Sequence, residues 1–149
     1  MSIISEEELR EVVEVVWMTV LDIPVDVGRA DNLASCETTT AQISITGAWN
    51  GVVLVKASER FLSQAAAFMF SSTMDAVDDN DRSETLTEMT NMLGGTVKCL
   101  LPETCDLSLP SLVSDESTLG DVAWLDFTCG DHPLAVAVSE HASGAQQAA

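Results

Sequence analysis

The feature that most constrains the fold of this chain is a pair of amphipathic helical segments that share one polar pattern. Residues 9–20 and residues 86–97 both read L-x-E-x-x-[E/N]-x-apolar-x-x-T-V. The two copies differ where Glu14 is replaced by Asn91 and where Met18 is replaced by Gly95. A pattern repeated at this distance predicts two related halves, each with a helix that packs one face on a common core.

The second segment, 83–101, has two distinct sides when its residues are placed at about 100° intervals around a helix. Its apolar stripe, which must face the core, is formed by Leu86, Met89, Leu93, Val97 and Leu100. The opposite side is formed by Glu84, Glu88, Asn91, Gly95 and Lys98. Because residues three apart are neighbours on a helix surface, Glu88 and Asn91 are expected to project together into solvent.

The Gly94-Gly95 pair inside this segment is unfavourable for a helix, by about 1 kcal/mol for each glycine relative to alanine. It therefore predicts close approach by another backbone. In the first segment the matching core stripe is Leu9, Val12, Val13, Val16 and Val20, but Glu14 stands in place of the amide and Met18 in place of the second glycine. The methionine side chain is therefore predicted to block that side of the first helix. The second carboxylate gives it a negative charge where the other helix has a neutral amide.

Length and composition predict a folded chain of one domain. The chain has 149 residues, of which 46% are hydrophobic, so it can bury a core without disulfides or metals. We assign residues 1–141 to the domain and expect 142–149, which are small and polar, to form a frayed tail. The N-terminus lacks the basic and apolar regions of a signal peptide, and no stretch reaches about 20 apolar residues, which predicts a cytoplasmic protein.

The charge balance argues against two classes of partner. Six basic and 24 acidic residues give a formal charge of −18, which repels nucleic-acid phosphates and anionic lipid surfaces. We therefore expect neither a nucleic-acid nor a membrane partner.

No familiar metal or nucleotide motif is present in the sequence. The four cysteines contain no C-x-x-C pair, and the two histidines are not spaced like metal ligands, so we predict no metal and four buried or half-buried thiols. The acidic run 75–81 lacks the glycine of a calcium-binding loop and is interpreted as a solvated loop leading into a helix. No Gly-rich phosphate-binding motif occurs.

The remaining segments predict two β-hairpins and a third helix. Helices are expected over 5–21, where Ser5 and Glu8 form a capping box, over 59–70 after Ser58, and over 83–101, capped by Asp81 with Glu84 or by Ser83. Strands are expected over 41–46 and 52–55, joined through Asn50-Gly51, over 122–128 and 134–138, joined by a turn at 130–133, and over 105–109. The predicted fold class is α+β: a pseudo-two-fold repeat of helix plus β-hairpin, with an antiparallel sheet covered by helices on one face.

These features together resemble the CheC/CheX/FliY family of chemotaxis phosphatases, and most closely its single-site CheX type. The resemblance covers roughly residues 6–140. It rests on Glu88-Met89-Thr90-Asn91 followed by Met92-Leu93-Gly94-Gly95, on the repeated helix and hairpin, and on the turn 47–51. A solitary E-x-x-N is a weak signal, but its place opposite the core stripe, before two glycines and within a repeat, makes it specific.

The resemblance implies a phosphatase that acts on the aspartyl phosphate of a CheY-like receiver domain. In that family the carboxylate corresponding to Glu88 docks on the receiver's lysine, and the amide corresponding to Asn91 orients the attacking water. Glu84, Thr87, Gly95 and Lys98 are then expected to contact the partner. The chain would need no cofactor of its own, because the Mg²⁺ belongs to the receiver, and it is expected to form a homodimer.

Two other interpretations remain open at this stage. Related domains also serve as non-catalytic binding or adaptor modules of the chemotaxis and flagellar-switch type. A purely structural domain is the third interpretation, but it leaves the two glycines and the change from glutamate to asparagine unexplained.

Overall fold

The computed structural model describes residues 4–21, 25–27, 36–101, 104–119, 121–129 and 132–140. Within these ranges the helices are α1 (Glu6–Leu21), α2 (Glu59–Met69) and α3 (Asp79–Cys99), with short 3-10 helices η2 (Met74–Ala76) and η3 (Glu116–Leu119). The strands are β1 (Val25–Val27), β2 (Thr38–Gly47), β3 (Gly51–Ser58), β4 (Cys105–Leu107), β5 (Ser111–Leu112), β6 (Leu125–Cys129) and β7 (His132–Glu140).

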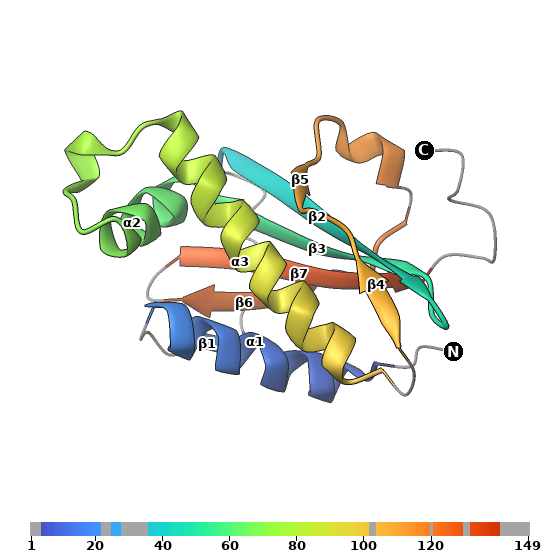
Figure 1. Ribbon diagram of the computed structural model, residues 1–149. Helices are drawn as coiled ribbons and strands as arrows, with labels where there is room; N and C mark the ends of the chain where they lie inside the picture. Colours follow the sequence, from blue (N-terminus) through green and yellow to red (C-terminus); the bar gives the residue numbers. More distant parts are fainter. Residues whose placement is uncertain are drawn as a thin grey trace.

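The strands form one antiparallel sheet. Its order is β1-β6-β7-β3-β2, and β4 and β5 both pair with the outer edge of β2, at Ile45–Gly47 and at Ala41–Gln42 respectively. The helices α1, α2 and α3 lie together on one face of this sheet (Figure 1), and α3 contacts both other helices. The predicted α+β class, antiparallel sheet and one-sided helical layer are confirmed, whereas the pseudo-two-fold repeat stays a prediction.

The first hairpin depends on a tryptophan packed against a glycine. A Cβ atom added to Gly51 would lie 2.3 Å from Cη2 of Trp49 and 2.7 Å from the carbonyl oxygen of Ser139, so no larger residue fits without a shift. At the other end of the turn, Gly47 has a φ of +132°, a conformation that favours glycine. Trp49 is only 3% exposed, so its ring belongs to the core of the hairpin.

The sheet separates two apolar clusters of unequal size. The larger lies between the sheet and the helices, and the smaller joins Val52, Leu54 and Ala137 to residues of the segment 113–124 on the other face. Because β3 is covered on both sides, seven of its eight residues are buried, which explains its continuous apolar sequence. β2 shows more alternation, with Ile43 and Ile45 buried between half-buried neighbours.

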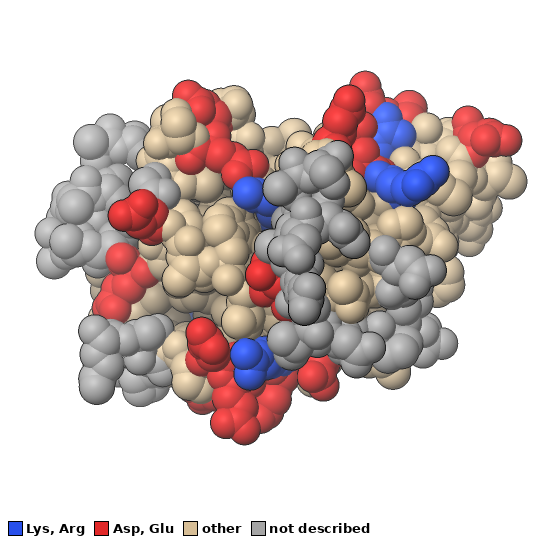
Figure 2. Space-filling model, turned by 180° about the vertical axis from the view of Figure 1, so that it is seen from behind, with Lys and Arg blue, Asp and Glu red and all other residues tan. Residues whose placement is uncertain are grey.

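A polar cluster fastens the segment 113–124 to the outer face of the sheet. Nζ of Lys56 lies 2.7 Å from Oε1 of Glu116 and 4.6 Å from the ring centroid of Trp124. The hydroxyl of Thr40 donates to Oε2 of Glu116 at 2.7 Å. Figure 2 shows this side of the molecule, where acidic side chains gather towards the edges and only scattered basic groups interrupt them.

Several predicted boundaries were wrong by a few residues. Helix α3 begins four residues early, at Asp79, and ends at Cys99; its expected core residue Leu100 follows the helix and is 40% exposed. Residues 122–124 are not part of β6, and His132 begins β7 rather than belonging to the turn. The strand expected over 105–109 ends at Leu107, and the very short β1 and β5 were not foreseen.

Other predictions were confirmed. Ser5 and Glu8 form the expected capping box, with Oγ of Ser5 accepting from the amide of Glu8 at 3.1 Å and Oε1 of Glu8 accepting from the amide of Ser5 at 3.0 Å. Ser58 caps α2 as predicted by accepting from the amide of Phe61. The predictions for residues 130–131 and for the tail 142–149 lie outside the described residues.

Candidate functional site

Helix α3 presents the candidate site, and its start is fixed by a strong capping arrangement. Oδ1 of Asp78 accepts from the amide of Asp81 at 2.8 Å, and Oδ2 of Asp81 accepts from the amide of Asp78 at 3.2 Å. The first turn also carries acidic side chains, which suit the positive end of the helix dipole. The cap therefore lies a turn earlier than the sequence indicated, because Asp78 competes successfully with Asp81 for the capping position.

The buried side of α3 anchors the helix to the sheet. Leu86, Met89, Leu93 and Val97 are all 1% exposed or less. The buried Thr85 and Thr90 donate their hydroxyl hydrogens to carbonyls four residues earlier, both at 2.8 Å, so their burial leaves no unsatisfied hydroxyl. Thr90, inside the motif Glu88-Met89-Thr90-Asn91, is thus a core residue.

The two glycines of α3 have different surroundings. A Cβ atom on Gly94 would lie 2.6 Å from Cγ2 of Ile43, so this glycine lets the helix approach β2 closely. A Cβ atom on Gly95 would meet nothing within 4 Å. The predicted close approach is therefore made by Gly94, to a side chain of the sheet rather than to a backbone, while Gly95 leaves open space.

The predicted pair Glu88 and Asn91 lies on the exposed side of α3. Both residues are exposed, and within the described part of the chain neither side chain makes a hydrogen bond or an ion pair. One carboxylate and one carboxamide, three residues apart, are therefore available to an incoming molecule. An amide can both accept and donate hydrogen bonds, whereas an ionised carboxylate only accepts.

The flanking residues expected to contact a partner share this side of the helix. Glu84 is exposed and accepts from Nδ2 of Asn80 at 3.2 Å, and the half-buried Thr87 donates to the carbonyl of Glu84 at 3.1 Å. Gly95 and Lys98 follow Asn91 and are half-buried. Lys98 makes no ion pair with any residue that the structure describes.

The equivalent side of α1 has the composition expected from its sequence. Glu11, Glu14 and Met18 are exposed, and Met18 is 47% exposed. The core stripe of this helix is confirmed for Leu9, Val12, Val13 and Val16, while the side chain of Val20 is not among those described. The first helix thus offers two carboxylates and a thioether where α3 offers a carboxylate, an amide and open space.

A pocket adjoins the candidate site at the C-terminal end of α3. It has a volume of about 510 Å³ and is lined by Gly95, Lys98, Cys99, Leu101, Thr104, Cys105 and Leu107. Sequence reasoning found Gly95 and Lys98 but not the residues contributed by Leu101 and β4. No signal in the sequence places β4 beside the last turn of α3, because this proximity arises only when β4 pairs with β2.

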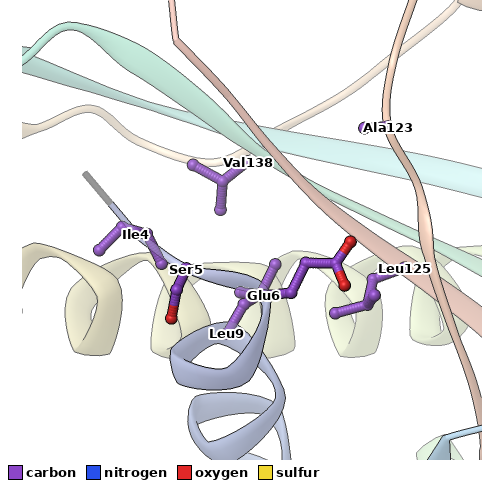
Figure 3. Close-up of a pocket in the computed structure, with 7 residues that line it drawn as sticks. All are labelled: Ile4, Ser5, Glu6, Leu9, Ala123, Leu125 and Val138. Carbon is purple, nitrogen blue, oxygen red and sulfur yellow. The ribbon is translucent and has the colours of Figure 1, made fainter. Parts of the chain in front are cut away.

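A second pocket lies elsewhere on the molecule (Figure 3). Its volume is about 260 Å³, and it is lined by the start of α1, by β7 and by the segment leading into β6: Ile4, Ser5, Glu6, Leu9, Ala123, Leu125 and Val138. Its lining is mostly apolar and includes no residue of α3. It therefore does not belong to the candidate site.

The four thiols differ in their exposure to solvent. Cys105 and Cys129 are buried, whereas Cys36 and Cys99 are exposed, so the prediction of four buried or half-buried thiols was wrong for two of them. Burial raises the pKa of the Cys129 thiol to about 11. Among the described residues, no three metal-ligating side chains converge on one point, and no helix is both long and apolar enough to cross a membrane.

Several solved structures share this fold. Chemotaxis protein CheX from Vibrio vulnificus superposes with a TM-score of 0.73 at 15% identity, covering 91% of this chain and 95% of that one. CheX from Desulfovibrio desulfuricans gives a TM-score of 0.67 at 19% identity, covering 89% and 96%. The CheX–CheY–BeF3–Mg²⁺ complex from Borrelia burgdorferi gives 0.68 at 12% identity, covering 95% and 100%.

Sequence comparison assigns the chain to a family, which the shared fold alone does not do. A search of curated protein sequences gives no match. The family described as chemotaxis phosphatase CheX matches residues 39–123, which is more than half of the chain and includes all of α3. The chain therefore belongs to the CheX family of chemotaxis phosphatases.

Proposed function

We propose that this chain hydrolyses the aspartyl phosphate of a CheY-like receiver protein, with Asn91 orienting the attacking water and Glu88 docking on a receiver lysine. The observation that carries the proposal is the exposed Glu88–Asn91 pair, whose side chains bond to no described residue, on a helix whose opposite side is buried. Membership of the CheX family supplies the reaction class. The solved complex of a related fold with CheY supplies the kind of partner.

Asn91 suits the task of positioning water. In hydrolysis the water oxygen bonds to phosphorus, the bond from phosphorus to the aspartate oxygen breaks, and the aspartate leaves as a carboxylate. The transition state is loose and spreads negative charge over the phosphoryl oxygens, so positioning and electrostatics dominate catalysis. The amide oxygen of Asn91 can accept from the water while its NH₂ group donates to a nearby oxygen. A carboxylate in this place, such as Glu14 on α1, would repel the phosphoryl group.

Glu88 suits the task of docking. Its carboxylate is exposed in the free chain and lies one helical turn from Asn91, so one receiver surface can meet both groups. In the complex an ion pair between Glu88 and a lysine would lose its water, and its removal would weaken binding more than removal of a charge at the rim. Glu84 and Thr87 extend the contact towards the start of α3. The Mg²⁺ that neutralises the phosphoryl group is proposed to belong to the receiver.

The test is the decay of a phosphorylated receiver from the same organism. A trace of the wild-type chain should accelerate decay with many turnovers, and Asn91→Ala should lower kcat by about 100-fold or more, because loss of a positioning group typically costs that much. Glu88→Ala should act mainly on KM. Normal turnover by Asn91→Ala would refute the assignment.

Gln64→Ala provides a matched control for Asn91→Ala. Gln64 is an exposed amide on α2, so its truncation removes the same chemical group from a helix surface that the proposal does not use. Its activity should equal that of the wild type. If the wild-type chain binds the phosphorylated receiver only in equimolar amounts and does not turn it over, the alternative adaptor role is supported instead.

Three wider features of the protein are also proposals. The pseudo-two-fold repeat is supported by the shared polar pattern of α1 and α3, and a homodimer is supported by the edge of the sheet, where Leu109 between β4 and β5 is 88% exposed. Light scattering would measure the molar mass in solution, which should be that of a dimer for the wild-type chain and that of a monomer for Leu109→Asp. A cytoplasmic location follows from the proposed partner.

A further inference from the structure

We infer that the pocket beyond Gly95 is a specificity site, which receives one large apolar side chain of the receiver while Lys98 pairs with a carboxylate beside it. This inference rests on the proposed function, because the occupant is the same receiver that Glu88 and Asn91 engage. The pocket is lined by residues from the last turns of α3 and from β4, together with Leu101 and Thr104.

The chemistry of the lining selects the occupant. Leu101 and Cys105 are buried and Leu107 is half-buried, so these three side chains give an apolar part to a lining that also has polar groups. The volume of about 510 Å³ falls within the range of small-molecule sites, which leaves room for a leucine, methionine or aromatic side chain. An uncharged apolar group gains free energy by leaving water for contact with these three side chains, whereas a charged group would lose its hydration there.

Charge adds a second requirement on the partner. Lys98 lines the pocket and makes no ion pair with the described residues, in a chain that has 24 acidic and only six basic residues. A cation that pairs with no described residue, beside the apolar side chains of the pocket, favours a carboxylate on the partner, and it disfavours a receiver with lysine or arginine at that point.

The pocket is continuous with the proposed catalytic surface. Gly95 lies one turn after Asn91, and Lys98 lies seven residues after Asn91, or about 10 Å along the helix. A Cβ atom on Gly95 would meet nothing within 4 Å, so the space between Asn91 and the pocket is open. A receiver whose phosphoryl group reaches Asn91 therefore has its neighbouring surface above the pocket.

Two substitutions test the contribution of the pocket to binding separately from the contribution of Asn91 to catalysis. Cys99→Trp fills the pocket from an exposed position on α3, and Lys98→Glu reverses the charge at its edge. Each should raise KM for the phosphorylated receiver about tenfold, equivalent to about 1.4 kcal/mol of binding free energy, with the loss in KM rather than in kcat. Asn91→Ala should show the opposite division, with the loss in kcat.

Matched controls exclude effects of net charge and of folding. Arg60→Glu makes the same change of charge at an exposed position on α2 outside the pocket, and it should leave KM unchanged at physiological salt. Thr104→Trp fills the pocket from its other side, also from an exposed residue, and it replaces Cys99→Trp if that variant does not fold. Thermal unfolding monitored by circular dichroism verifies each variant.

The outcomes distinguish this inference from the proposed function. If the wild-type chain turns the receiver over and the pocket variants have the wild-type KM, the pocket inference is wrong and the proposed function stands. If the wild type shows no turnover but binds the BeF3-activated receiver, and the pocket variants lose that binding, the pocket inference stands and the catalytic proposal fails. A chain that neither binds nor hydrolyses any receiver overturns both.

Discussion

Adding one methyl group at Gly95 should stabilise this chain, whereas adding one at Gly94 should give no gain or a loss of stability. Both residues are inside α3, so alanine gains about 1 kcal/mol at either position from helix propensity alone. At Gly95 the new Cβ meets nothing within 4 Å, and the whole gain should appear as added stability. At Gly94 the new Cβ would lie 2.6 Å from Cγ2 of Ile43, which is well inside van der Waals contact.

The cost at Gly94 follows from the burial of its neighbour. Ile43 is 0% exposed and sits in a strand paired on both sides, so its methyl group cannot move aside without shifting α3 or β2. Overpacking of this kind costs about 1–3 kcal/mol, which exceeds or cancels the gain in propensity. Gly95→Ala should therefore be more stable than Gly94→Ala by about 1–3 kcal/mol, or about 2–12 °C in Tm at about 2–4 °C per kcal/mol.

Urea unfolding followed by circular dichroism measures this difference directly. The double variant Gly94→Ala with Ile43→Leu supplies the control, because leucine lacks the branch at Cβ that carries the clashing methyl group. It should recover part of the stability lost by Gly94→Ala, and the double-mutant cycle should show favourable coupling. Equal stability of the Gly94→Ala and Gly95→Ala variants would refute the reasoning, since it would mean that α3 does not depend on a missing side chain for its approach to β2.

Three further predictions follow from other parts of the structure. Asp78→Ala should lower the free energy of unfolding by about 1 kcal/mol, because the amide of Asp81 loses its capping acceptor; a urea titration measures it. Burial opposes ionisation of Glu116, but hydrogen bonds from Lys56 and from a threonine, with the charge of Lys56, outweigh it and lower the pKa. The stabilisation by Glu116 is therefore present above the ordinary glutamate pKa and lost as pH falls through the lowered value, so the stability difference between the wild type and Glu116→Gln should shrink in acid. The Cys129 thiol, with its pKa raised to about 11 by burial, should resist alkylation at pH 8 while the exposed thiols react, as measured by mass spectrometry.

Local patterns in the sequence were sufficient to predict the helices and the exposure of Glu88 and Asn91. The stripe from Leu86 to Val97 fixes which side of α3 is buried, and this places Glu88 and Asn91 in solvent. The same reasoning failed at Leu100, because the helix ends at Cys99 and the helical spacing no longer applies beyond it. Capping was also ambiguous, since several acidic residues near Asp78 could serve and only the folded chain selects one.

Contacts between distant segments could not be predicted from such patterns. The three residues of β1 and the two of β5 are too short to show a period, and they become strands only because β6 and β2 offer them an edge. The pocket beside Gly95 is missed for the same reason, since Leu107 reaches α3 only through the pairing of β4 with β2. The burial of the Trp49 ring against the bare surface of Gly51 is likewise a contact that no local pattern indicates.

The sheet separates two apolar clusters that support different parts of the protein. The core on the helix side positions α3 and therefore the Glu88–Asn91 pair. Among the described residues, the rear cluster around Leu54 and Ala137 packs against Val113, Leu119, Val122 and Trp124 and against no residue of α3. Selection can therefore adjust the overall stability of the protein through the rear cluster without displacing the site. Lineages adapted to different temperatures should accordingly differ more behind the sheet than beneath the helix.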